Sequence, residues 1–166
     1  MINRVMFWLA KFFLLVWTMT AIGATHVHRV LLVDDYVPVR IILRNILTGY
    51  VDLRIVGEAC DGKQAIEQVA ACQPDIILMD YNMPMMNGIE AARLIKKSWG
   101  ETVIIGLCTV QDTYIIEGFL KAGALEVICK DRIDHLHSTI QRAFPKRASS
   151  NRLVAQHKVS QCHKAA

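Results

Sequence analysis

Short apolar runs alternate with longer amphipathic stretches along the middle of the chain. The runs are rich in Val, Ile and Leu without a polar face, which is typical of strands buried on both sides of a parallel sheet. We predict five strands: Val30–Val33, Leu53–Ala59, Asp75–Met79, Val103–Cys108 and Val127–Cys129. The stretches between them place apolar residues three or four positions apart, which predicts five helices: Val37–Thr48, Asp61–Cys72, Ile89–Ser98, Gln111–Ala122 and Ile133–Phe144. The regular alternation indicates an α/β fold, with a doubly wound parallel sheet and helices on both faces.

Polar side chains with distinct chemistry follow four of the five predicted strands. Asp34 and Asp35 follow the first, Asp80 the third, Thr109 the fourth and Lys130 the fifth. The carboxyl ends of parallel strands meet at one edge of a sheet, where ligands bind in this fold class. A lone aspartate at a strand end usually caps a helix, but three carboxylates together repel one another unless a cation is present. Mg²⁺ prefers such oxygen ligands, so the pattern predicts a magnesium site.

The residues around these positions resemble the receiver domain of two-component response regulators. The matching segments are LLVDD at Leu31–Asp35, DIILMDYNMPMMNG at Asp75–Gly88, Thr109, KAGA at Lys121–Ala124, and Lys130. The resemblance covers residues 29 to about 144 and implies a flavodoxin-like five-stranded sheet with strand order 2-1-3-4-5. The sequence EACDGKQAIE at Glu58–Glu67 is similar to that of the subfamily whose output domain is a helix-turn-helix.

The resemblance implies a role for each site residue. It implies that Asp80 accepts a phosphoryl group from a sensor histidine kinase or a phosphotransfer protein. The implied Mg²⁺ ligands are Asp80, Asp35, Asp34 acting largely through water, and the backbone carbonyl of Asn82. Thr109 is implied to bond a phosphoryl oxygen and move inward, while Lys130 pairs first with the Asp80 carboxylate and then with the phosphoryl group.

One position departs from the family pattern. The aromatic residue that swings behind the hydroxyl in the family stands three residues before the lysine, and here that residue is Val127. We therefore expect activation to run mainly through Thr109 and the helix that follows it.

The two ends of the chain differ in composition from its middle. The run Val5–Ala24 is 20 residues long with one charge, Lys11, and is just long enough to cross a bilayer. Three interpretations fit residues 1–26: a membrane anchor with contact through residues 5–24, a secretory signal, or an over-extended translation start before a native start such as Met19. Residues 146–166 hold five basic and no acidic residues, and we expect a solvated tail.

Charge argues against nucleic-acid binding by the middle of the chain. Residues 27–145, the expected receiver domain, hold all 15 acidic residues and 12 basic ones, for a net charge of −3. A helix-turn-helix domain needs roughly 60 residues, more than follow Pro145. We expect no specific DNA binding by this chain.

The histidines and cysteines show no spacing typical of a metal site. There are two His-x-His pairs, without an obvious third ligand nearby in the sequence, and we expect them to face solvent: His26/His28 and His135/His137. Three cysteines end or interrupt apolar runs and are expected to be small buried residues in a reducing compartment: Cys60, Cys108 and Cys129. The expected location of the domain is the cytoplasm.

Three functions from different classes follow. The first is a phosphorylatable receiver that switches its affinity for an output partner, which the sequence does not identify. The second is a degenerate receiver acting as a constitutive protein-interaction module, an alternative that Val127 keeps open. The third is a phosphohydrolase of the haloacid-dehalogenase type, but that chemistry needs an acid two residues after the nucleophile, where Asn82 stands. We expect a phospho-acceptor with at most self-catalysed phosphorylation and dephosphorylation, not an enzyme.

Overall fold

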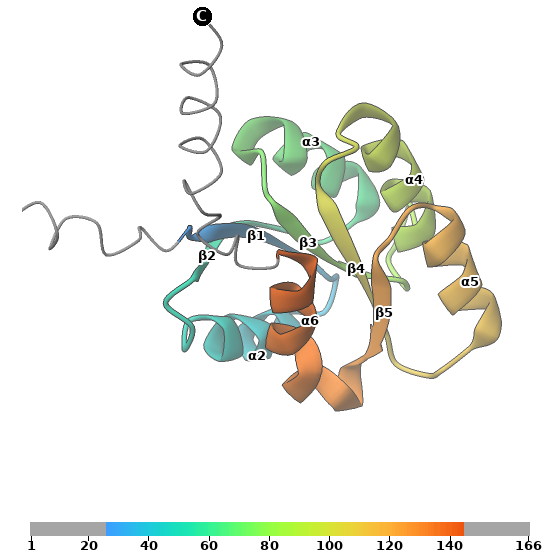
Figure 1. Ribbon diagram of the computed structural model, residues 1–166. Helices are drawn as coiled ribbons and strands as arrows, with labels where there is room; N and C mark the ends of the chain where they lie inside the picture. The colour runs from blue at the N-terminus through green and yellow to red at the C-terminus, as the bar shows by residue number, and fades with distance from the viewer. Residues whose placement is uncertain (1–25, 145–166) are drawn as a thin grey trace, which may run out of the picture.

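Five parallel strands form the sheet at the centre of the fold (Figure 1). The computed structural model describes residues 26–144. The strand order is β2-β1-β3-β4-β5, which confirms the predicted flavodoxin-like topology. The strands are β1 (His28–Val33), β2 (Leu53–Ala59), β3 (Ile76–Asp80), β4 (Val103–Cys108) and β5 (Glu126–Cys129).

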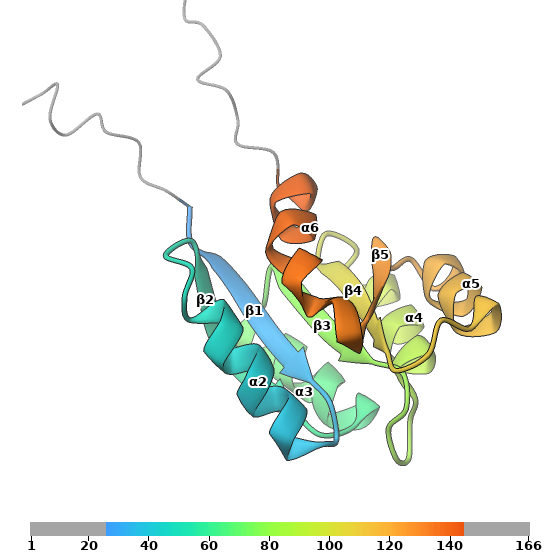
Figure 2. The same ribbon diagram turned by 90° about the horizontal axis from the view of Figure 1, so that it is seen from below.

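Helices cover both faces of the sheet (Figures 1 and 2). One face packs on α2 (Val37–Leu47) and α6 (Leu136–Ala143). The other packs on α3 (Gly62–Cys72), α4 (Gly88–Ser98) and α5 (Thr113–Lys121). Each face therefore has its own hydrophobic core, as a doubly wound sheet requires.

Strand β1 shows how the sequence sets the register. Val30 and Leu32 point into the core under α2 and α6, while Leu31 and Val33 point into the core on the opposite face. All four are fully buried, because β1 lies inside the sheet and helices cover both of its faces. Val33 pairs with Met79 of β3, so the residues that follow each strand emerge side by side. This register brings Asp34 next to Asp80.

The segment after β5 differs from the prediction of one continuous helix. A 3-10 helix, η1 (Lys130–His135), comes first, and α6 begins only at Leu136. Arg132, within η1, has non-helical backbone angles, φ −118° and ψ 33°, which kink this segment before α6 begins. Helix α5 likewise begins later than predicted, because the Asp112 side chain caps it by accepting from the Tyr114 amide.

All four paired histidines were predicted to face solvent, but two of them do not. His26 and His135 are exposed, but His28 packs against Phe144 with ring centroids 4.2 Å apart. His137 stacks on Tyr50 at 3.7 Å. The prediction was wrong for these two because their aromatic neighbours are distant in sequence.

The cysteine prediction holds in part. Cys108 and Cys129 are buried, as expected, whereas Cys60 is exposed beside the start of α3.

The predictions for the two ends concern the apolar segment, residues 1–26, and the basic tail, residues 146–166. Apart from His26, both lie outside the described residues. Within residues 26–144, no helix has both the length and the apolar character needed to cross a membrane.

Candidate functional site

Three carboxylates meet at the carboxyl-terminal edge of the sheet. One oxygen from each of Asp34, Asp35 and Asp80 lies within 4.8 Å of the others. Asp34 is fully buried and Asp80 is 3% exposed, whereas Asp35 is open to solvent. The sequence argument, that parallel strand ends converge, is confirmed for these residues.

A turn after β1 holds Asp34 in place. The Asp34 amide donates to the carbonyl of Ala59, which extends the pairing of β1 with β2 by one residue. The Asp34 Oδ1 accepts from the Tyr36 amide at 2.9 Å, an Asx-type turn that redirects the chain into α2. Pro38 lies in the first turn of that helix, where its missing N–H removes no helical hydrogen bond. One of the two carboxylate oxygens of Asp34 therefore accepts a hydrogen bond from the backbone.

Lys130 joins the two buried carboxylates. Its Nζ lies 2.6 Å from Asp34 Oδ2 and 2.9 Å from Asp80 Oδ1. Burial alone would lower the pKa of Lys130, but the hydrogen bonds and charges of Asp34 and Asp80 outweigh burial and raise it. Burial raises the pKa of Asp80; Lys130 opposes this shift and the Asp34 charge adds to it. One ammonium against three carboxylates leaves the cluster negative.

The acidic cluster fits a hard divalent cation. Lys130 is the one cation that faces the three carboxylates among the described residues, and it lies against the two buried ones. All the side-chain ligands offered here are carboxylate oxygens, which suit Mg²⁺. Asp35, being exposed, leaves the cluster accessible from solvent.

Asn82 and Thr109 lie at the same edge but are not drawn into the cluster. Asn82 is exposed in the loop after β3, two residues beyond Asp80. Thr109 directly follows β4 and is exposed; its backbone carbonyl accepts a contact from Cys129 Sγ at 3.4 Å. Among the described residues, the Thr109 hydroxyl makes no hydrogen bond to the three carboxylates.

Gly88 lets the start of α4 approach Asp80 closely. The Gly88 amide donates to the Tyr81 carbonyl at 3.0 Å, and Asn87 caps the helix by accepting from the Glu90 amide. A Cβ at Gly88 would stand 1.9 Å from the backbone oxygen of Asp80. Only glycine leaves room for this turn, which places Asp80 against the first residue of α4.

The sequence analysis missed an ion-pair network behind Asp34. Arg40 Nη1 donates to the Asp34 carbonyl at 2.7 Å, and its Nε donates to Glu58 Oε2 at 3.0 Å. Arg44 pairs with the other oxygen of Glu58. Glu58 lies across from Leu32 in the β1–β2 register, so only the strand pairing reveals that Arg40 can reach both groups.

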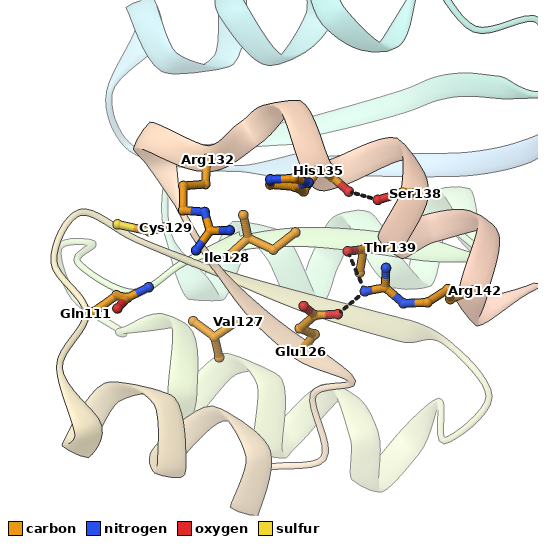
Figure 3. Close-up of a pocket in the computed structure, with 10 residues that line it drawn as sticks. All are labelled: Gln111, Glu126, Val127, Ile128, Cys129, Arg132, His135, Ser138, Thr139 and Arg142. Carbon is orange, nitrogen blue, oxygen red and sulfur yellow. Dashed lines mark hydrogen bonds and ion pairs between the residues drawn. The ribbon is translucent and has the colours of Figure 1, made fainter.

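A separate groove of about 370 Å³ runs between β5 and α6, with η1 at one end (Figure 3). Val127 lines it, and no member of the acidic cluster does. Arg142 crosses it to pair with Glu126 at 2.7 Å and Thr139 at 2.9 Å. The position of the expected switch aromatic thus carries a small side chain beside a polar groove.

Comparison with known sequences agrees with this geometry. Residues 30–141 match the family described as "Response regulator receiver domain". The chemotaxis protein CheY of Thermotoga maritima is 42% identical over 106 residues, which cover 61% of this chain and 84% of that protein. A protein-glutamate methylesterase/protein-glutamine glutaminase of the same organism is 39% identical over 117 residues, covering 70% of this chain and 33% of the relative. The chain thus spans about a third of the length of that methylesterase.

Solved structures show the same fold. The response regulator domain of Thermotoga maritima CheB matches with a TM-score of 0.65 and 32% identity, over 71% of this chain and 97% of that domain. The receiver domain of the putative response regulator NarL from Mycobacterium tuberculosis matches with a TM-score of 0.66 and 28% identity, over 71% of this chain and 97% of that domain. The site, the strand order and the sequence match agree: the chain belongs to the response regulator receiver domain family.

Proposed function

We propose that this protein is a phosphorylatable receiver, in which Asp80 accepts a phosphoryl group and the phosphorylated form binds an output partner with changed affinity. The observation that carries the proposal is the position of Asp80. Its carboxylate is held at the end of β3, 2.9 Å from Lys130 and beside Asp34 and Asp35. A phospho-acceptor needs such a nucleophile with positive charge at hand.

The chain's own residues supply nucleophile and positioning. A carboxylate oxygen of Asp80 attacks the phosphorus of the donor and forms a P–O bond. The bond between phosphorus and the donor breaks, and its electrons leave with the donor group, a histidine imidazole or, for acetyl phosphate, acetate. Lys130 faces the Asp80 oxygen and stabilises negative charge that builds up during transfer.

Mg²⁺ is the proposed cofactor at this site. The ligands would be Asp35, Asp80 and the backbone carbonyl of Asn82, with Asp34 acting through water. The surplus of negative charge, three carboxylates against one ammonium, supports a cation here. When bound, Mg²⁺ supplies charge neutralisation for the carboxylates and the transferred group.

We propose that Thr109 passes the change to the face formed by β4, α5 and β5. A phosphoryl group on Asp80 adds acceptor oxygens at the strand ends, and the Thr109 hydroxyl can donate to one of them. Val127 offers no ring to swing inward, so we expect a small rearrangement of the loop before α5.

The proposed partners are a sensor histidine kinase or a phosphotransfer protein on the donor side and an output protein on the other. We assign phosphorylation to the cytoplasm, where these donors obtain phosphate from ATP. We propose no specific DNA binding and no enzymatic activity beyond self-catalysed phosphorylation and dephosphorylation. Residues 5–24 remain a candidate for membrane contact.

The experiment is the intact mass of the full chain after incubation with acetyl phosphate and Mg²⁺. The parent should gain about 80 Da, the mass of one added phosphoryl group. Asp80→Asn should gain nothing, while Asp134→Asn, which changes an exposed carboxylate away from the cluster, should match the parent. An unmodified parent would favour a constitutive interaction module, and an equal gain in Asp80→Asn would refute the assignment.

A further inference from the structure

A second set of metal-ligand side chains lies at the opposite edge of the sheet. His26 and His28 stand at the start of β1, and Asp75 directly precedes β3. One ligand atom from each lies within 4.8 Å of the others. We propose that these three residues form a binding site for a divalent transition-metal ion, with Zn²⁺ as the expected occupant.

The backbone explains why these three residues converge. In an extended chain, residues two apart point to the same side, so His26 and His28 can face one ligand together. Both the backbone amide and the side chain of Asp75 bond to Arg29 of β1. Its amide donates to the Arg29 carbonyl at 2.9 Å, and its Oδ2 accepts from the Arg29 amide at 2.7 Å. The third ligand, which the sequence did not reveal, thus comes from the β1–β3 pairing.

His28 supplies an independent indication of a missing partner. Its Nδ1 is buried and has no hydrogen-bond partner among the described residues. The ring packs against Phe144 near the end of α6, which lies close to the start of β1 (Figure 2). A buried polar nitrogen without a partner is unfavourable, and a bound metal ion would satisfy it.

The ligands of this second site favour a different metal from the one that the acidic cluster favours. Two imidazoles and one carboxylate are typical of Zn²⁺ sites with three protein ligands and one open position. The acidic cluster offers only oxygens, which suit Mg²⁺. Burial, and then the neighbouring His26, lower the pKa of His28, while Asp75 and Asp52 oppose this shift.

The other His-x-His pair serves as a natural control. His135 ends η1 and His137 lies in α6, so their side chains diverge along a helical segment. His137 stacks on Tyr50 and approaches Asp52 at 3.4 Å, whereas His135 is exposed. The two pairs have the same spacing in sequence, but among the described residues only in the first do both histidines and one carboxylate bring ligand atoms within 4.8 Å of one another.

The test is calorimetric titration of the EDTA-treated, dialysed full chain with ZnCl₂ in saturating Mg²⁺, which keeps the acidic cluster occupied. Asp75→Asn is the decisive variant, because the amide oxygen still accepts from the Arg29 amide while the carboxylate ligand is lost. Asp75→Asn and His28→Ala should each weaken the Zn²⁺ site at least tenfold, since even partners of ligands affect affinity about 10–100-fold. His135→Ala should bind as the parent does.

Folding and location are checked in the same samples. Each variant should keep the parent's circular dichroism, and Zn²⁺ should shift the amide resonances of residues 26–28 and 75 in the parent. Unchanged Zn²⁺ affinity in a folded Asp75→Asn protein would overturn the proposal, as would shifts confined to the acidic cluster. These readouts do not depend on phosphorylation, so failure here leaves the proposed function untouched.

Discussion

Replacing Gly88 with alanine tests whether the close approach of α4 positions Asp80. The new Cβ would stand 1.9 Å from the Asp80 backbone oxygen, 2.9 Å from its carbonyl carbon and 3.0 Å from Met79 Cγ. Carbon and carbonyl oxygen do not approach within 3.0 Å at such a site, so the two backbones must separate by about 1 Å. Overpacking a well-packed interior typically costs about 1–3 kcal/mol. Because the obstacle here is backbone, we expect the upper end, about 3 kcal/mol.

Urea unfolding followed by circular dichroism measures the change. Gly88→Ala should lower the free energy of unfolding by about 3 kcal/mol with an unchanged denaturant slope. Gly100→Ala is the matched control, because its Cβ would have only the Lys96 carbonyl at 3.7 Å as a neighbour, and it should stay within about 0.5 kcal/mol of the parent. The displaced Asp80 should also be phosphorylated about 100-fold more slowly, since a 1 Å misplacement has effects of that order. A Gly88→Ala protein as stable and as reactive as the parent would refute this reasoning.

Four further predictions concern charge and switching. Burial raises the pKa of Asp80, so the folded state loses stability as pH rises from about 3.8 through the folded pKa. Because Asp80→Asn removes the buried charge, this variant should raise the melting temperature of the metal-free protein at pH 7. Lys130→Ala leaves Asp34 buried without its ion pair and should lower the free energy of unfolding by about 3 kcal/mol in urea. The lowered pKa of His28 means that the unfolded chain binds more protons than the folded protein below about pH 6.5. The free energy of unfolding, measured in EDTA, should therefore fall as pH decreases below about 6.5. In His28→Gln this fall should be less steep. Thr109→Ala should leave Asp80 phosphorylation intact but suppress the amide shift changes that beryllofluoride causes in α5 and β5; shifts that persist would exclude Thr109 as the main route.

The strand ends were predictable because their signal is local. Four of the five buried runs are followed by a charged residue or a hydroxyl, and parallel pairing brings those ends to one edge whatever the detailed register. Asp34, Asp35 and Asp80 could therefore be placed together from the sequence. The contacts of Lys130 with both buried carboxylates were expected only in part, because the resemblance implied pairing with Asp80 and the structure adds Asp34.

Features that depend on register and on distant packing were not predictable. Arg40 donates to the Asp34 carbonyl and also to Glu58, which the β1–β2 register brings beside β1. Asp75 meets His28 across the β1–β3 pairing, 47 positions along the chain. The kink within η1 lies at Arg132, whose residue type gives no helix-breaking signal. For Arg40 and Asp75 the deciding interaction lies between segments that a local pattern does not connect.

The most direct test of the central claim is to locate the phosphoryl group on the chain. The protein is treated with acetyl phosphate and Mg²⁺, reduced with borohydride so that an aspartyl phosphate becomes homoserine, digested, and sequenced by tandem mass spectrometry. We expect homoserine at position 80 and unmodified aspartate at positions 34 and 35. Conversion at Asp34 or Asp35 with Asp80 intact, or no conversion in a folded protein, would contradict the account.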